Sequence, residues 1–257
     1  MTWNIDDLFS NWFLLILLLD RFQPSVVLLQ EVRMYKNQVN ELAEKLPDYT
    51  IFTLLPEDIL ETMEQRLRVT RKRAKYGLLI AVRNDDPTHV KLIKKESNSY
   101  LAIERDGILI ASIYMPQQGR GEKVFSTEMN KLSSCIEKNR GENQLLLFGD
   151  WNLSSKHKKS RHDIFDKVVD PWDIMVTKPV SYTNRNFCGA KSCLDWMVHS
   201  PEISVTLEVL THEAYPMNQS SHTPVIATIE YERDTQEENE HKNGNNPNDI
   251  SGLFYKH

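Results

Sequence analysis

Acidic side chains end or interrupt apolar segments at three places in the sequence. Glu31 ends the run Val-Val-Leu-Leu-Gln-Glu, Asp150 ends Leu-Leu-Leu-Phe-Gly-Asp, and Asp195 lies within Cys-Leu-Asp-Trp-Met-Val. A carboxylate at the end of a buried strand is costly unless it is paired or bound to a cation. If the three converge, their oxygens form a pocket suited to Mg²⁺ or Mn²⁺, to which Asn4 and Asn152 add amide groups. Taken alone, each acid has a simpler explanation as a cap, a turn residue or a charge at the rim.

Short apolar segments predict the strands that must position these acids. The continuous run Val26–Leu29 is typical of a strand covered on both faces. The turn Arg105-Asp106-Gly107 contains the Asp-Gly pair that predicts a hairpin between the segments on either side. The predicted strands are 26–29, 78–82, 100–103, 108–113, 145–148, 205–207 and 225–229, with another at Val198.

Helical segments alternate with these strands. We predict helices over residues 11–21, 36–46, 57–72 and 122–138. Strands buried on both faces need a second sheet or helices against each face. The sequence therefore predicts an α/β (or α+β) sandwich, in which two layers of sheet are flanked by helices.

The composition is that of an ordinary soluble protein. The chain has 257 residues, of which 40% are hydrophobic and 26% charged, and three cysteines. These values exclude collagen-like, coiled-coil and wholly disordered classes, and they argue against a disulfide-stapled secreted domain. The apolar run 12–19 is too short to span a membrane, which needs about 20 residues. We expect an intracellular protein, with the nucleus as one compatible location, and no membrane as partner.

The character of the chain changes near residue 233. The segment Arg233–Asn248 holds no aliphatic side chain. Such a segment cannot bury enough apolar surface to offset its ordering entropy. We therefore expect one domain over residues 1–232 and a disordered polar tail over 233–257.

The chain has two locally basic clusters although its net charge is −5. One lies within residues 66–75, and the other lies within 156–161, close behind Asn152. A charge run is often only a solvated face, but local basic surfaces also bind nucleic acid in proteins of acidic net charge. The second cluster adjoins a candidate catalytic motif, which favours phosphate binding there.

Six short motifs follow one another along the chain: Trp3-Asn4-Ile5, Leu29-Gln30-Glu31-Val32, Tyr114-Met115-Pro116, Gly149-Asp150-Trp151-Asn152, Leu194-Asp195-Trp196 and Ser220-Ser221-His222-Thr223-Pro224-Val225. Each motif is weak alone, but together they cover nearly the whole chain except the tail. In this order they resemble the endonuclease/exonuclease/phosphatase superfamily, which includes DNase I, exonuclease III and the apurinic/apyrimidinic endonucleases. The resemblance implies the four-layered α/β sandwich of that superfamily as the fold.

The resemblance also implies a role for each chemical residue. Glu31 would hold Mg²⁺ or Mn²⁺ with Asn4 nearby. Asp150 would position or deprotonate a water, Asn152 would hold a phosphate, and Tyr114 would donate to that phosphate. Catalysis would further use Asp195, which would orient and charge-stabilise His222.

The position before His222 departs from the superfamily pattern. That pattern has an aspartate where this chain has Ser221. Serine keeps a hydrogen-bonding group but removes a negative charge, so metal affinity should fall. Two interpretations stay open: an active enzyme that relies on Glu31, or a weakened protein retained for binding nucleic acid.

Three further segments narrow the resemblance. Residues 118–121 are similar to the apurinic endonuclease branch, in which an arginine at this place touches DNA. Residues 4–31 and 181–195 are similar to endonuclease domains of non-LTR retrotransposons. The implied function is Mg²⁺-dependent hydrolysis of phosphodiester bonds in DNA by a monomer. An RNA 3′-exonuclease, another phosphoesterase and a non-catalytic module are the alternatives. The expected nucleic-acid contacts are Arg120, Lys156, Lys158 and Lys159.

Overall fold

The apolar segments form two six-stranded sheets. The computed structural model describes residues 1–55, 76–84, 89–93, 97–154 and 159–231. The first sheet has the order β13 (Ser204–Val209), β14 (Val225–Glu230), β1 (Thr2–Asn4), β2 (Val26–Gln30), β4 (Leu78–Arg83) and β3 (Tyr49–Leu54). The second has the order β5 (Val90–Leu92), β6 (Tyr100–Arg105), β7 (Ile108–Tyr114), β8 (Gln144–Asp150), β12 (Asp195–His199) and β9 (Met175–Thr177).

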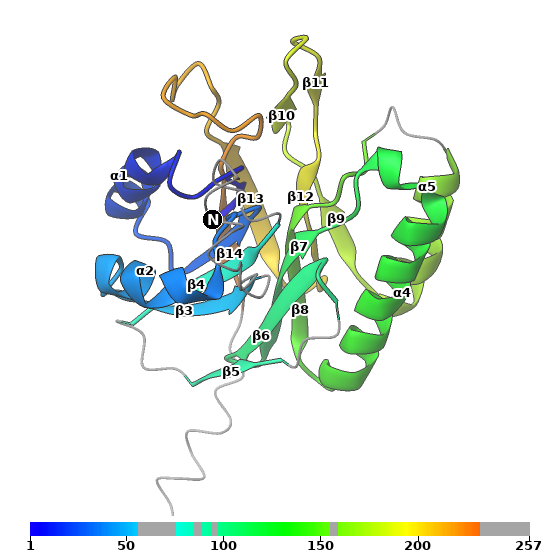
Figure 1. The fold of residues 1–257 in the computed structure, drawn as a ribbon. Helices are drawn as coiled ribbons and strands as arrows, with labels where there is room; N and C mark the ends of the chain where they lie inside the picture. Colours follow the sequence, from blue (N-terminus) through cyan, green and yellow to red (C-terminus); the bar gives the residue numbers. More distant parts are fainter. Residues whose placement is uncertain (56–75, 85–88, 94–96, 155–158, 232–257) are drawn as a thin grey trace, which may run out of the picture.

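Helices cover the outer face of each sheet (Figure 1). Against the first sheet lie α1 (Trp12–Phe22) and α2 (Val39–Lys45), and η1 (Lys36–Gln38) directly precedes α2. Against the second lie α4 (Glu122–Asn139) and α5 (Lys159–Val169), with η2 (Gln118–Arg120) before α4 and η3 (Asp170–Trp172) after α5. A hairpin of β10 (Asn184–Arg185) and β11 (Lys191–Ser192) projects beyond the start of β12.

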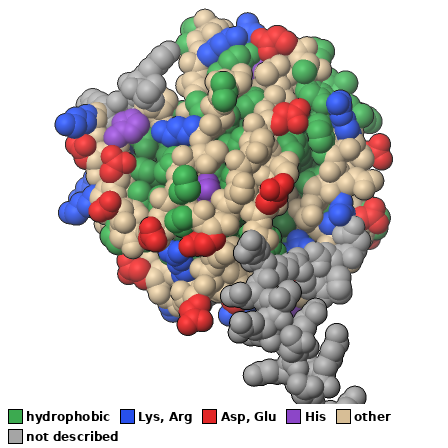
Figure 2. All heavy atoms as spheres, turned by 180° about the vertical axis from the view of Figure 1, so that it is seen from behind, with side chains coloured by type: hydrophobic (Ala, Val, Ile, Leu, Met, Phe, Trp, Pro, Cys, Tyr) green, Lys and Arg blue, Asp and Glu red, His purple; other side chains and the backbone are tan. Residues whose placement is uncertain are grey.

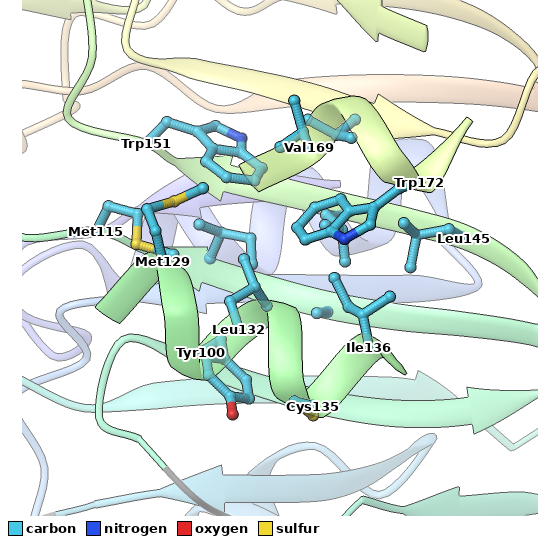
Figure 3. Packing of buried hydrophobic residues seen from close by; sticks show 14 of the residues in the cluster. Tyr100, Met115, Met129, Leu132, Cys135, Ile136, Leu145, Trp151, Val169 and Trp172 are labelled. Carbon is cyan, nitrogen blue, oxygen red and sulfur yellow. The ribbon is translucent and has the colours of Figure 1, made fainter. Parts of the chain in front are cut away.

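Three apolar clusters separate the layers. Alternate residues of one strand enter different clusters: Leu29 packs with the α1 leucines, whereas Leu28 packs between the sheets. Both faces of β2 are therefore buried, which explains its continuous apolar run. The cluster under α4 and α5 includes Trp151, Leu132 and Trp172 (Figure 3).

Strand direction brings the site-bearing ends together. The pairs β1–β2 and β7–β8 are parallel, whereas β12 runs antiparallel to β8. The last residue of β8, Asp150, therefore pairs with the first residue of β12, Asp195, and also with Tyr114 at the end of β7. These residues share one end of the second sheet.

The predicted α/β sandwich is confirmed, and the predicted strands are all present. The predicted helix 36–46 is shorter, because 36–38 form a 3₁₀ turn before α2. Helix α5 was not predicted, since its basic residues were interpreted only as a charge cluster. The predicted helix 57–72, the cluster 66–75 and the tail 233–257 lie outside the described residues. Within the described ranges, no helix has the length and apolarity needed to cross a membrane.

Candidate active site

The predicted site residues converge from both sheets. They come from the end of β1, the residue after β2, the end of β7, the β8–β12 pair and the segment before β14. All are buried or half-buried. The residues brought together are Asn4, Glu31, Tyr114, Asp150, Asn152, Asp195 and His222.

Glu31 is surrounded by hydrogen-bond donors. Its Oε1 accepts from Asn4 Nδ2 at 3.2 Å and from the Tyr114 hydroxyl at 2.8 Å, while its Oε2 accepts from Arg33 at 3.1 Å. Burial raises the pKa of this carboxyl, but the donated hydrogen bonds and the charge of Arg33 outweigh burial and lower it. Glu31 is therefore a carboxylate over the physiological pH range.

Arg33 and Asp6 are members of this group that the sequence analysis missed. The guanidinium of Arg33 forms an ion pair with Asp6 as well as with Glu31. The sequence offers only proximity as a signal, because Asp6 follows Asn4 by two positions and Arg33 follows Glu31 by two. The side-chain alternation of an extended strand does not apply here, because Asp6, Glu31 and Arg33 have left-handed φ angles.

The backbone of this region adopts an uncommon conformation. The φ angles of Asp6, Glu31, Arg33 and Asn152 are 47°, 51°, 50° and 48°. Non-glycine residues in the left-handed region cost about 1–3 kcal/mol each and concentrate at functional sites. The clustering of four of them here is independent support for a functional centre.

Among the described residues, the hydrogen bonds to Asp150 come from amide groups. Its Oδ2 accepts from Asn4 Nδ2 at 3.0 Å and from Asn152 Nδ2 at 3.1 Å, and its Oδ1 accepts from the Asn152 backbone at 2.9 Å. Burial is the largest influence on its pKa and raises it. Only glycine fits at the preceding position, 149, because a Cβ there would lie 2.3 Å from the carbonyl oxygen of Ile113.

His222 lies between two carboxylates. Its Nδ1 is 2.8 Å from Asp195 Oδ2, and its Nε2 is 3.7 Å from Asp150 Oδ2. Burial lowers the pKa of this imidazole, but Asp195 and Asp150 outweigh burial and raise it to about 9. The ring is therefore an imidazolium near neutral pH, with its Nε2–H beyond hydrogen-bond reach of Asp150.

Residues distant in sequence fix the backbone of His222. Its carbonyl oxygen accepts from Trp3 Nε1 at 3.1 Å and from Asn218 Nδ2 at 2.7 Å. The Ser220 hydroxyl accepts from the His222 amide and donates to the Asn4 carbonyl at 2.6 Å. The two ends of the fold thus position one imidazole, a role that sequence motifs did not reveal for Asn218 or Ser220.

Oxygen atoms at the site fit a divalent cation. Within the described residues, Asn4 Oδ1 and Asp195 Oδ1 are buried and accept no hydrogen bond. Atoms of Asp150, Asp195 and His222 also lie within 4.8 Å of one another. His222 is a poor ligand because its charged ring already binds Asp195. Glu31 and Asn4 Oδ1 are better donors, since Mg²⁺ and Mn²⁺ prefer oxygen.

Ser221 does not restore the missing charge. Its hydroxyl accepts from Asn184 Nδ2 at 3.2 Å, and its carbonyl accepts from the Arg185 amide at 2.8 Å. Ser221 thus ties the segment before β14 to the β10–β11 hairpin.

The predicted phosphate contacts differ in position. Arg120 is exposed on η2 and stacks on the Tyr76 ring, with 5.6 Å between guanidinium carbon and ring centroid. Lys159 is exposed at the start of α5, while Lys156 and Lys158 lie outside the described residues.

The assignment of Arg161 to a basic surface is wrong. This side chain is 2% exposed, and its guanidinium donates to the carbonyls of Pro116, Gln117 and Asn152. It therefore clamps the two loops that follow β7 and β8 instead of facing solvent.

A cavity of about 300 Å³ adjoins the site. Its wall includes Leu153 and Ser154, which follow Asn152, and Cys193, two residues before Asp195. Lys178 lies over the Trp196 ring at 4.5 Å, and Lys191 lies over the Tyr182 ring at 3.9 Å. Both lysines line the cavity, which gives it positive charge beside the carboxylates.

No family model matches the sequence, and no curated protein matches it. Solved structures share its fold. The AP endonuclease from Archaeoglobus fulgidus has a TM-score of 0.66 at 14% identity, over 89% of this chain and 98% of its own. The 3′ phosphatase NExo from Neisseria, bound to a product DNA hairpin, has a TM-score of 0.65 at 16% identity, over 90% of this chain and 98% of its own. The AP endonuclease LMAP from Leishmania major has a TM-score of 0.66 at 13% identity, over 90% of this chain and 86% of its own. These likenesses confirm the expected four-layered fold.

Proposed function

From the fold that this chain shares with those enzymes, we propose that it is a Mg²⁺-dependent hydrolase of phosphodiester bonds in DNA. The observation that carries the proposal is the unbroken set of contacts Glu31–Asn4–Asp150–His222–Asp195. It places a carboxylate held ionised, a carboxyl of raised pKa and an imidazolium at one end of the sheets. Apurinic or retrotransposon-type nicking is the substrate class that the sequence motifs favour.

Glu31 and Asn4 Oδ1 are the residues that would hold the ion. Glu31 is ionised, and the Asn4 oxygen is buried without a hydrogen-bond donor among the described residues. When bound, a divalent ion supplies Lewis acidity for a phosphate oxygen and for the leaving oxygen.

Asp150 and His222 supply the proton chemistry. The raised pKa of Asp150 suits a general base that takes a proton from an attacking water near neutral pH. His222 would donate its Nε2–H to a nonbridging phosphate oxygen, because Asp195 occupies only Nδ1. Tyr114 donates to Glu31 in this structure, so its expected bond to phosphate requires the hydroxyl to exchange partners.

Nucleic acid would be held by cations around the site. Arg120, Lys159, Lys178 and Lys191 are the described candidates. Figure 2 shows acidic and basic side chains interspersed over the face drawn there, so a broad basic surface does not cover that face. Backbone contacts of this kind give salt-dependent affinity with little sequence preference.

A plasmid-nicking assay tests the proposal. Supercoiled DNA is incubated with the protein and Mg²⁺ or chelator, and relaxed product is measured. Glu31→Ala and His222→Ala should each lose about 10²–10³-fold in rate, as expected when a pre-aimed charge or donor is removed. Asp166→Asn, an exposed acid on α5, is the matched control. Nicking that persists in chelator or in His222→Ala would reject the mechanism.

Substrate panels separate the alternatives. The same reactions with an abasic oligonucleotide, a 3′-phosphorylated oligonucleotide and poly(A) RNA compare endonuclease, 3′-phosphatase and RNA exonuclease activities. The 3′-phosphatase is a second candidate, because NExo shares the fold and is described as a 3′ phosphatase. DNA binding without turnover of any substrate would favour the non-catalytic module.

A further inference from the structure

Arg33 places a positive charge between two carboxylates at the candidate metal site. One nitrogen, Nη2, contacts Glu31 Oε2 at 3.1 Å and also pairs with Asp6 Oδ1. A guanidinium in this place satisfies the charge that a divalent cation would otherwise satisfy.

The remaining oxygen of Glu31 is already engaged. Asn4 and Tyr114 both donate to Oε1, which leaves Oε2 to Arg33. A cation that approaches Glu31 through Oε2 therefore displaces the guanidinium or shares that oxygen with it.

The side chain of Arg33 can move while its backbone stays in place. The side chain is 30% exposed, against 13% for Glu31. The backbone amide of Arg33 donates to the Tyr76 carbonyl at 3.0 Å, and the amide of Asp7 donates to the Glu31 carbonyl at 2.9 Å. Exposure lowers the cost of withdrawing the guanidinium, and the backbone bonds preserve the loop when it leaves.

We propose that Arg33 is a tethered competitor for the divalent cation, which holds Glu31 and Asp6 together in the metal-free protein and sets the affinity for the ion. The proposal rests on the metal-binding role proposed for Glu31. Since Ser221 adds no negative charge, the positive charge of Arg33 reduces the cation affinity of this site more than it would in a more acidic site. Arg33 is a positioning residue and contacts no substrate in this role.

The expected effect follows from Coulomb's law. A unit charge about 5 Å from a divalent ion changes its affinity at least about tenfold even at the dielectric constant of water. Arg33→Gln should therefore bind Mn²⁺ at least about tenfold more tightly than the unaltered protein, whereas Arg33→Lys, which keeps the charge, should bind it similarly.

The experiment measures Mn²⁺ binding to the metal-free full chain by electron paramagnetic resonance. Lys91→Gln is the matched control, since it removes one positive charge from an ion pair of 2.9 Å with Glu104 at the edge strand β5. Thermal unfolding is a second readout. Arg33→Gln should melt lower than the unaltered protein without metal and gain more from added Mn²⁺.

The outcomes separate the two proposals. Tighter binding by Arg33→Gln, but not by Lys91→Gln, supports the competitor. Equal or weaker binding by Arg33→Gln overturns it and indicates that Arg33 only shapes the loop. Loss of Mn²⁺ binding in Glu31→Gln supports the metal-binding role of Glu31, whatever the affinity of Arg33→Gln. Absence of binding in every variant overturns the metal site and the competitor together.

Discussion

The two sheets contribute chemically different halves to one site. The first sheet supplies Glu31, whose carboxylate accepts hydrogen bonds from Arg33, Asn4 and, across the sheets, Tyr114 of β7, so the pKa of Glu31 is lowered despite burial. The second sheet supplies Asp150, whose pKa is raised chiefly by burial and further by the nearby charge of Asp195. Two carboxyls joined through one asparagine thus differ in charge state because their surroundings differ. The first half suits cation binding, and the second suits proton transfer.

The largest expected effect comes from variants that disable one half of the site at a time. Asp150→Asn should lower kcat by about 10³-fold, as expected for loss of a general base, while Mn²⁺ affinity changes little. Glu31→Gln should instead lose Mn²⁺ affinity. Single-turnover nicking and Mn²⁺ titration measure the two effects, and circular dichroism checks folding. If both variants lose metal and rate alike, the division of labour is wrong.

The second prediction tests the charge state of His222. The pKa is raised from 6.5 to about 9, so the stability it contributes is fully present below about pH 6.5 and is lost as pH rises through about 9. Asp195→Asn removes the charge that raises the pKa and should lower it. NMR titration of the His222 ring and denaturant unfolding at about pH 6 and about pH 10 measure both consequences. An unchanged pKa in Asp195→Asn would show that Asp195 does not hold the imidazolium.

The smallest expected effect is an increase in Mn²⁺ affinity and nicking activity. Ser221→Asp adds the carboxylate that the superfamily pattern has at this position, and it should raise Mn²⁺ affinity and nicking several-fold, in line with one added charge at a partly exposed site. Ser221→Asn, which keeps the bond to Asn184 without charge, is the control. No change in either property would mean that the motif alignment, or the role assigned to this position, is wrong.

Local sequence patterns predicted the architecture well where burial is two-sided. The runs 26–29, 78–82 and 145–148 inside β2, β4 and β8 are apolar because both faces of these strands are covered. Local patterns did not predict helix α5, in which the Arg161 side chain is buried while its neighbours are more exposed. A basic side chain that donates to three backbone carbonyls is indistinguishable in sequence from one in solvent.

The sequence by itself determined which chemical groups are present and in what order, because the motifs and apolar runs are local. Only the tertiary structure decided what those groups touch. The bond from Asn4 to Asp150 spans 146 positions, and the one from Trp3 to His222 spans 219. Such contacts depend on which distant strands lie side by side, and a local pattern does not encode that order. The charge states of Glu31, Asp150 and His222 follow from the same contacts, since burial and neighbouring charges set each pKa.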